Sequence, residues 1–335
     1  YAGSSSIDAK YDYRKLGETW STPRIIRIKV SGKDKWVAVF GGGYNGAVNP
    51  NVGSAVFVMD LEDEGRLLKV IDIVDTSADI INSLPADLSV ITADGTNKAN
   101  YNGAMIYATD LEGKVTKINL TDKGTLYQST TLFTAESTSA NGRYIYTRPE
   151  VTINNDNNLW LYFGTGSTQK LQAQSSQIKN RLYGIKDKNF PNFATVSSPE
   201  NVSKCKTAPT CPGGTDLGWY VDLKKSQKLT AEPTVDKDRV YFPIYEPDTT
   251  SACKTGNAIL TGYDSKCGNS VLNVNMGKGV LSKVVKQGDN LYIGLAGEVN
   301  TNIAGFTSKD NLITGKSKAK AASGAVQLES WKENY

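Results

Sequence analysis

The sequence predicts an all-β chain built from a repeated unit of about four strands, which is the organisation of a β-propeller. The main observation is a recurring series: an extended strand, an aromatic–glycine strand, and an apolar strand that ends on aspartate. One copy reads TPRIIRI at residues 22–28, WVAVFGGG at 36–43 and AVFVMD at 55–60. Another reads RPEVTI at 148–153, LWLYFGTG at 159–166 and LYGIKD at 182–187. A single β-sandwich would explain the strands but not this recurrence.

The second observation is a proline that opens each copy. These residues are Pro23, Pro85, Pro149 and Pro233, and a fifth, weaker copy begins near Gly279. Proline is tolerated at the first position of a strand, so each marks the entry to a sheet. The copies are longer than the roughly 40–50 residues of common propeller repeats. The excess is explained by long inserted loops at residues 46–53, 167–181, 190–216 and 246–257.

Two residue types within the repeat have predicted structural roles. The glycines after the aromatic residues predict close approach of neighbouring backbones. Asp60, Asp187 and Asp264 recur at strand ends, where aspartate side chains form turns and bind backbone N–H groups. We therefore interpret them as turn-forming residues and not as catalytic carboxylates.

Composition narrows the function classes. The chain has 335 residues, with 39% hydrophobic and 21% charged, which is typical of a globular protein. A formal net charge of +4 and scattered basic residues argue against nucleic-acid binding, and no apolar run is long enough to predict a membrane span. The chain contains no histidine, which removes the commonest general base and metal ligand. Since Tyr1 is not a start methionine, we expect a fragment or the mature part of a longer protein.

The four cysteines predict disulfide bonds and an extracytoplasmic location. Cys205, Cys211, Cys253 and Cys267 form two local pairs in loop-like sequence, without the spacing of a zinc site. Two loop-stapling disulfides are therefore favoured over zinc. Proximity in the sequence favours the pairings Cys205–Cys211 and Cys253–Cys267.

Several motifs, in order, resemble the C-terminal propeller domain of the PilC/PilY proteins, the type IV pilus tip-associated adhesins and biogenesis factors of Gram-negative bacteria. The resemblance runs from about residue 20 to residue 335. It rests on WVAVFGGGYN at 36–45, LPA at 84–86, YATDLEG at 107–113, RPEV at 148–151, YFGTG at 162–166, GWYVDL at 218–223 and SWK at 330–332.

The resemblance implies a modified, quinoprotein-like propeller in which residues 1–335 form one C-terminal domain and residues 1–19 are a partial blade or linker. The ring is then either incomplete or closed by the termini of the chain. The implied function is non-enzymatic: support of pilus extension against retraction, of twitching motility and of host-cell adhesion, with roles in fimbrium biogenesis and virulence. The implied partners are minor pilins at the pilus tip, on the outer surface of a Gram-negative bacterium, together with host epithelial surface or matrix.

The same resemblance implies a nine-residue calcium loop at residues 94–102. Asp94 and Asn102 stand at the positions of its first and last ligands, and Thr96 and Asn100 offer further oxygens. Lys98, however, occupies the central acidic position, and a cation there opposes metal binding. We expect weak or absent calcium binding by this degenerate loop; the alternative to a bound Ca²⁺ is an Asn/Gly-rich turn.

Two other functions compete with the pilus-biogenesis role. One is a module that binds a host receptor or matrix directly, with residues 190–216 and 246–257 as its contact surface. The remote one is a quinone-dependent dehydrogenase, which the fold would allow but for which the sequence assembles no catalytic constellation.

Overall fold

The described chain is almost entirely β-structure. The computed structural model describes residues 8–45, 52–73, 80, 82–92, 103–154, 158–251, 253–317 and 319. These residues form 22 strands and two three-residue 3-10 helices, η1 (Ala9–Tyr11) and η2 (Val202–Lys204). Within the same residues, no helix has the length and apolar character needed to cross a bilayer. The predicted all-β fold is confirmed.

The first two sheets are simple four-stranded meanders. The first sheet has the order β1 (Arg24–Val30), β2 (Lys33–Gly41), β3 (Ala55–Asp60) and β4 (Leu67–Asp72). The second has the order β5 (Ser89–Ile91), β6 (Met105–Thr109), β7 (Lys114–Asn119) and β8 (Ser129–Thr134). All neighbouring strands in both are antiparallel, as in a propeller blade.

The third sheet has five strands, because an inserted loop adds one to its edge. Its order is β12 (Cys205–Thr207), β13 (Gly218–Asp222), β11 (Arg181–Asp187), β10 (Leu159–Gly164) and β9 (Glu150–Ile153). The added strand β12 lies in the insertion at residues 190–216 and pairs with β13 in parallel.

The fourth sheet joins the last two predicted copies of the repeat into nine strands. Its strands are β14 (Lys228–Leu229), β15 (Thr234–Asp236), β16 (Arg239–Glu246), β17 (Asn257–Asp264), β18 (Ser270–Leu281), β19 (Val285–Gln287), β20 (Asn290–Val299), β21 (Phe306–Lys309) and β22 (Leu312–Lys316). The two copies meet where β18 pairs with β20. There Gly277 and Gly297 have φ angles of +138° and +152°, and a Cβ on Gly297 would lie 2.0 Å from the carbonyl oxygen of Lys278. Only glycine fits this crossing, so it keeps the two copies continuous.

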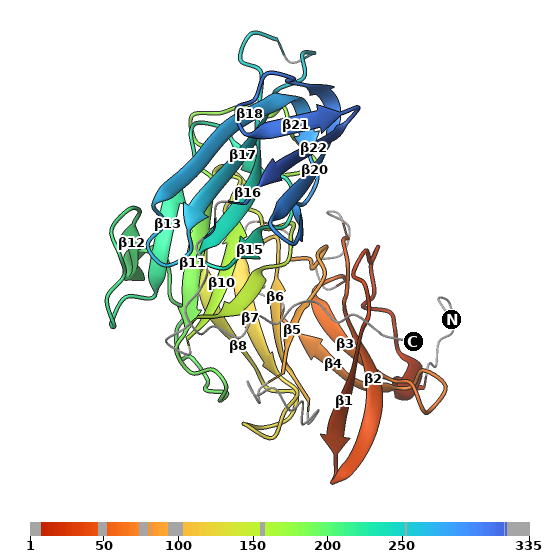
Figure 1. Ribbon diagram of the computed structural model, residues 1–335. Coiled ribbons are helices and arrows are strands. Elements are labelled where there is room, and N and C mark those ends of the chain that lie inside the picture. Colours follow the sequence, from red (N-terminus) through yellow and green to blue (C-terminus); the bar gives the residue numbers. More distant parts are fainter. Residues whose placement is uncertain are drawn as a thin grey trace.

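The sheets stack face to face in chain order, and Figure 1 shows them along an arc from the first sheet to the fourth. The reason is visible in β10, which is buried on both faces. Its odd residues Leu159, Leu161 and Phe163 pack toward the second sheet, whereas Trp160 and Tyr162 pack toward the fourth. Side chains alternate between the two faces of a strand, so an uninterrupted apolar run fills two cores at once.

The predicted entry prolines mark the first strand in three sheets; in the fourth sheet the short strand β14 comes before Pro233. Pro23, Pro149 and Pro233 directly precede β1, β9 and β15, and Pro85 lies shortly before β5. The described part of residues 1–19 covers the outer face of the first sheet, where the ring of Tyr13 stacks on Phe57 at 5.8 Å.

Candidate functional site

The predicted calcium loop lies outside the described residues. Asp94, Thr96, Asn100 and Asn102 all belong to that part of the chain. Weak or absent calcium binding therefore stays a prediction. Calorimetry on chelator-treated protein tests it, with Asp94→Ala as the matched variant; tight binding that this variant abolishes would contradict the prediction.

The cysteine pairing predicted from the sequence is wrong. The disulfide joins Cys211 to Cys267, which are 56 residues apart, while Cys205 and Cys253 are free thiols. Cys211 lies in the loop between β12 and β13, and Cys267 lies in the turn between β17 and β18. Stacking of the third sheet on the fourth brings these two turns together, so the bond connects sheets instead of closing a local loop. Burial raises the pKa of the Cys205 thiol to about 12, which makes this group a poor nucleophile.

The strand-end aspartates act as turn-forming residues, as predicted. The carboxylate of Asp60 accepts from the backbone N–H of Glu62 at 2.9 Å, and that of Asp264 accepts from the N–H of Cys267 at 2.7 Å. Asp187 likewise accepts from the N–H of Asn189 at 3.0 Å. These bonds satisfy donors in tight turns. Asp187 has a second role that the sequence did not indicate.

Asp187 is the centre of a buried ionic contact between the second and third sheets, which we call the second–third joint. Its Oδ2 lies 2.6 Å from the Nζ of Lys117 and accepts from the hydroxyl of Tyr107 at 2.6 Å. The side chain of Lys117 is fully buried, and its Nζ also donates to the carbonyl of Asn192 at 2.8 Å. Burial lowers the pKa of Lys117, and burial together with Asp187 raises that of Tyr107. Lys117, Asp187 and Tyr107 therefore fix the second and third sheets to each other, and their burial keeps a substrate from reaching them.

The contact between the third and fourth sheets, the third–fourth joint, contains a buried lysine that bonds only to carbonyls. The Nζ of Lys228 donates to the backbone oxygens of Leu171, Ala173 and Ser226 at 2.8–2.9 Å. Two of these oxygens belong to the insertion at residues 167–181, so Lys228 ties that loop to the start of the fourth sheet. Burial lowers the pKa of Lys228 to about 8. Gly166, on which a Cβ would lie 2.6 Å from the Cβ of Lys228, permits this approach.

Aromatic side chains complete the third–fourth joint. The indole Nε1 of Trp219 and the hydroxyl of Tyr162 both donate to the carbonyl of Ser265, at 2.9 and 3.0 Å. Ser265 lies in the same turn as the disulfide cysteine Cys267. The turn is therefore held by one covalent bond and two partly buried hydrogen bonds.

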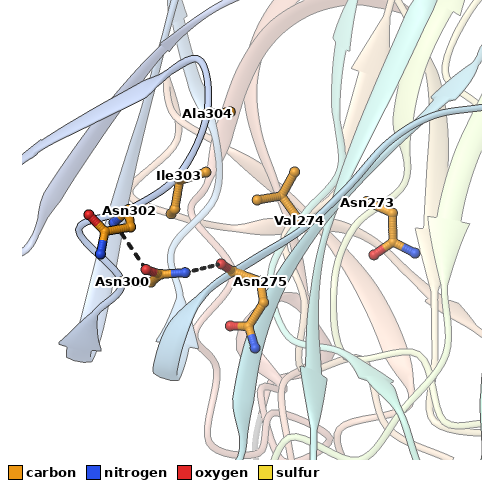
Figure 2. Close-up of a pocket in the computed structure, with 7 residues that line it drawn as sticks. All are labelled: Asn273, Val274, Asn275, Asn300, Asn302, Ile303 and Ala304. Atoms are coloured by element: carbon orange, nitrogen blue, oxygen red, sulfur yellow. Dashed lines mark hydrogen bonds between the residues drawn. The ribbon is translucent and has the colours of Figure 1, made fainter.

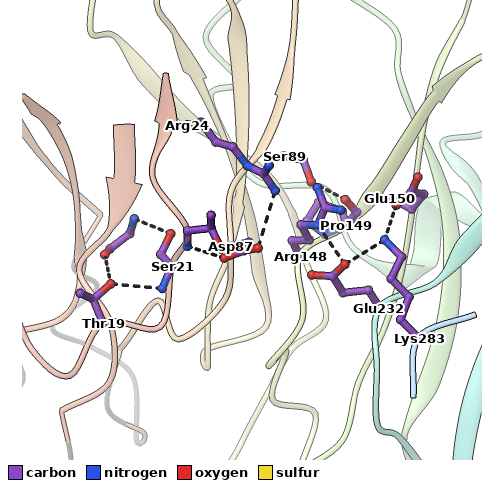
Figure 3. Close-up of polar contacts among 12 residues, drawn as sticks. Thr19, Ser21, Arg24, Asp87, Ser89, Arg148, Pro149, Glu150, Glu232 and Lys283 are labelled. Atoms are coloured by element: carbon purple, nitrogen blue, oxygen red, sulfur yellow. Dashed lines mark hydrogen bonds and ion pairs between the residues drawn. The ribbon is translucent and has the colours of Figure 1, made fainter. Parts of the chain in front are cut away.

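A row of polar residues crosses the sheets where the first strand of each repeat begins (Figure 3). Arg24 lies 3.6 Å from Asp87, and Glu232 pairs with Arg148 at 3.0 Å and with Lys283 at 2.9 Å. Lys283 also reaches Glu150 at 3.4 Å. The three carboxylates of this row thus each have a basic partner. This arrangement aligns the sheets and favours a structural role over acid–base chemistry.

The inserted loops pack against different parts of the fold. Residues 190–216 pack along the second sheet, where the N–H of Phe193 donates to the carbonyl of Lys123 at 3.0 Å. Residues 246–257 instead meet the insertion at 167–181, because Gln172 donates to the carbonyl of Lys254 and Gln174 to that of Asp248, both at 2.6 Å. Two neighbouring insertions therefore share one surface.

A charged groove of about 430 Å³ lies beside this pair of insertions. It is lined by Asp248, Lys254, Thr255, Lys278, Gly297 and Glu298. Two acidic and two basic side chains in one open groove suit a charged protein surface better than a small apolar ligand. We take this groove, with the loops at 167–181 and 246–257, as the candidate interaction surface.

A sequence relative and a solved structure are both similar to this chain. No protein-family model matches the chain. The chain is 26% identical over 279 residues to the type IV pilus biogenesis factor PilY1 homolog of Xylella fastidiosa strain Temecula1, a match that covers 72% of this chain. The chain spans only 18% of the length of that relative.

In fold, the chain is similar to the crystal structure of the Pseudomonas aeruginosa PilY1 C-terminal domain. The TM-score is 0.59 at 15% identity, and the match covers 86% of this chain and 74% of that one. The sequence match and the fold match together confirm the predicted resemblance to a PilY1-type C-terminal domain.

Proposed function

We propose that the chain is a non-catalytic domain of a type IV pilus biogenesis protein, located outside the cytoplasm. The observation that carries this proposal is the sequence match to a relative named as a type IV pilus biogenesis factor, over most of this chain. The fold supports it, because the buried charges link sheets and the polar row is ionically balanced. The disulfide between Cys211 and Cys267 is consistent with an oxidising compartment.

In this role the domain supports pilus extension against retraction, and through it twitching motility and adhesion. Its partners are minor pilins at the pilus tip. The charged groove beside residues 246–257 is the surface that we assign to this contact. Its side chains of both signs can pair with complementary charges on a protein partner and set its orientation.

Deletion of the domain from the full-length protein tests the proposal. We expect few surface pili and loss of twitching, measured by electron microscopy and by a stab-agar assay. Normal pili and normal motility in the deletion strain would refute the proposal.

A charge-reversal variant tests the assigned surface. Lys254→Glu combined with Lys278→Glu inverts the sign of the basic side chains in the groove, and we expect the motility defect of the deletion. Lys309→Glu changes an exposed lysine on β21 of the same sheet and is the matched control. Equal motility of both variants would show that the groove is not the contact surface, and it would leave the proposed pilus role unaffected.

A second candidate is direct binding of a host receptor or matrix through residues 190–216. What favours it is that the middle of this loop is exposed while the disulfide at Cys211 holds it to the fourth sheet, which limits the entropy lost on binding. Purified protein should then bind epithelial cells saturably, and replacing residues 206–210 and 212–216, with Cys211 kept, should abolish binding while piliation persists.

A further inference from the structure

The outer face of the first sheet is only half covered. This sheet lies at one end of the arc of sheets, and its inner face packs on the second sheet (Figure 1). On its outer face, Tyr13 and Leu16 cover Phe57. The other half of this face carries Ile25, Trp36 and Leu61, whose exposed fractions are 64%, 47% and 43%. We call these three residues the end patch.

Strand pairing places the residues of the end patch next to one another. Trp36 of β2 is opposite Arg27 of β1, and residues opposite each other in an antiparallel pair share a face. Because side chains alternate along a strand, Ile25 lies on the same face as Arg27 and is a diagonal neighbour of Trp36. On the other side of β2, the N–H of Leu61 donates to the carbonyl of Trp36 at 3.0 Å. The end patch is therefore one continuous apolar surface.

Among the described residues, the other end of the arc has no comparable patch. Val271, Val285 and Leu312 are exposed on the fourth sheet, but they belong to β18, β19 and β22, which do not pair with one another. The open depression beside β18 is lined mainly by asparagines, among them Asn300 and Asn302 (Figure 2). Contiguous exposed apolar side chains mark a contact site, so the end patch is the place where a covering segment is expected.

The segment at residues 320–335 has a composition that suits this patch. It is the longest stretch outside the described part of the chain. Residues 321–325 are alanine, serine and glycine, and Val326, Leu328 and Trp331 follow them. Trp331 is the one tryptophan in the sequence that lies outside the described residues. Three large apolar side chains in this segment can thus match the three of the end patch.

The segment is long enough to reach the end patch. The hydroxyl of Ser317 bonds to the side chains of Asp236 and Tyr241, so the chain is still held to the fourth sheet at this point. Stacked sheets lie about 10 Å apart, which puts the first sheet about 30 Å from the fourth. The residues from 320 to Trp331 span up to about 40 Å when extended.

The charges beside the patch and in the segment are complementary. Arg27 and Lys29 lie on the face of Ile25, and both pair with one carboxylate, Asp34, at 3.6 and 2.8 Å. Two cations against one anion leave a net charge of +1. Residues 326–333 hold two glutamates and one lysine, which gives them a net charge of −1. Electrostatic attraction of this kind favours the correct orientation of the segment on the patch.

A tethered segment fits the end patch better than a second copy of the chain does. A stable dimer buries roughly 800 Å² on each partner, and three partly exposed side chains supply far less. A segment of the same chain has an effective concentration of about 1 mM at the patch, so even a small contact area is sufficient.

From these observations we propose that residues 326–331 pack on the end patch, with Trp331 against Ile25 and Trp36. The segment completes the cover that Tyr13 and Leu16 begin on the same face. It also makes the outer face of the first sheet unavailable to a partner protein. This inference goes beyond the pilus role and does not depend on it.

Photo-cross-linking of the full chain tests the proposal. The purified chain carries p-benzoylphenylalanine in place of Trp331, and mass spectrometry of a digest identifies the cross-linked residues after irradiation. We expect intrachain cross-links to residues 25–36 and 59–61. Ile25→Ser combined with Trp36→Ser should lower their yield at least tenfold.

The matched control is Val285→Ser combined with Leu312→Ser, which changes two exposed apolar side chains of the fourth sheet. Its cross-linking yield should stay within twofold of that of the unmodified patch. Thermal melting followed by circular dichroism checks that each variant keeps its fold.

Four results would overturn the proposal. They are no intrachain cross-link, cross-links mainly to the fourth sheet, and a yield that the patch variant leaves unchanged. The fourth is a covalent dimer as the main product on a denaturing gel, which would show that a second copy occupies the patch.

Discussion

The second–third joint and the third–fourth joint perform the same task with different chemistry. The former places Lys117 against Asp187 and Tyr107 in a sealed ionic contact. The latter has a buried lysine of its own, Lys228, but surrounds it with carbonyls and adds the Cys211–Cys267 bond. When two opposite charges are buried together, each offsets the desolvation cost of the other. A cation surrounded by carbonyl oxygens has only part of that cost offset.

This difference determines which conditions loosen each joint. The second–third joint depends on keeping both charges, so we expect it to respond to charge removal and not to reductants. The third–fourth joint depends on an oxidised disulfide, which reductants break. The second–third joint is then insensitive to reductants, whereas the third–fourth joint depends on the oxidising exterior where we propose that the domain works.

The largest expected effect comes from Lys117→Met. The variant leaves Asp187 buried without its cation, and breaking such a pair costs about 3–5 kcal/mol of unfolding free energy. Guanidinium denaturation measures the loss. Lys117→Met combined with Asp187→Asn removes both charges and should recover part of it. A cost below about 1 kcal/mol for the single variant would show that the ion pair does not hold this joint.

Loss of the disulfide comes next. Cys211→Ser should lower the unfolding free energy by about 2–4 kcal/mol, since the cross-link no longer restricts the unfolded chain. Cys253→Ser is the matched control, because Cys253 is an exposed free thiol. Equal denaturation midpoints for both variants would contradict a role of the disulfide in the third–fourth joint.

Lys228→Met should cost less, about 1–3 kcal/mol, because three carbonyl oxygens lose their donor but no charge is left buried. The effect should be local, with faster proteolysis of the insertion at residues 167–181. Lys225→Met replaces an exposed lysine nearby and should leave both measurements unchanged. A loss as large as that of Lys117→Met would erase the distinction between the two lysines.

A pH dependence of the third–fourth joint is expected as well, and it is no larger than the effect of Lys228→Met. The folded protein holds the Lys228 proton with a pKa of about 8, below the ordinary lysine pKa of about 10.4. Between these values the unfolded chain binds more protons, so unfolding becomes less favourable as pH rises. The unmodified chain should therefore gain about 1–3 kcal/mol relative to Lys228→Met from pH 8 to 10.4. A constant difference across this window would contradict the burial of a charged Lys228.

The sequence predicted the repeat well, because local physics controls its markers. Proline restricts strand entry, and Asp60, Asp187 and Asp264 satisfy turn donors within a few residues, so both leave a signal in the order of residues. The continuity of the fourth sheet was not predicted. It depends on the φ angles of Gly277 and Gly297, and a glycine in sequence does not reveal its φ.

The contacts between sheets could not be read from the sequence. Nearness along the chain favoured Cys205–Cys211, but the stacking of distant strands decides which turns meet. Lys117 and Lys228 looked like ordinary polar positions in short strands, because nothing near them in sequence marks Asp187 or the carbonyl of Leu171 as a partner. The charged groove was missed in the same way, since it combines residues 248–255 with Lys278 and Glu298.

Hydrogen exchange followed by mass spectrometry, with and without reductant, tests most directly whether the two joints are independent. We predict that reduction raises exchange in peptides covering residues 205–217 and 264–270, while β7 and β11 around Lys117 and Asp187 keep their protection. Equal loss of protection in β7 and β11, or no change at residues 264–270, would contradict the account.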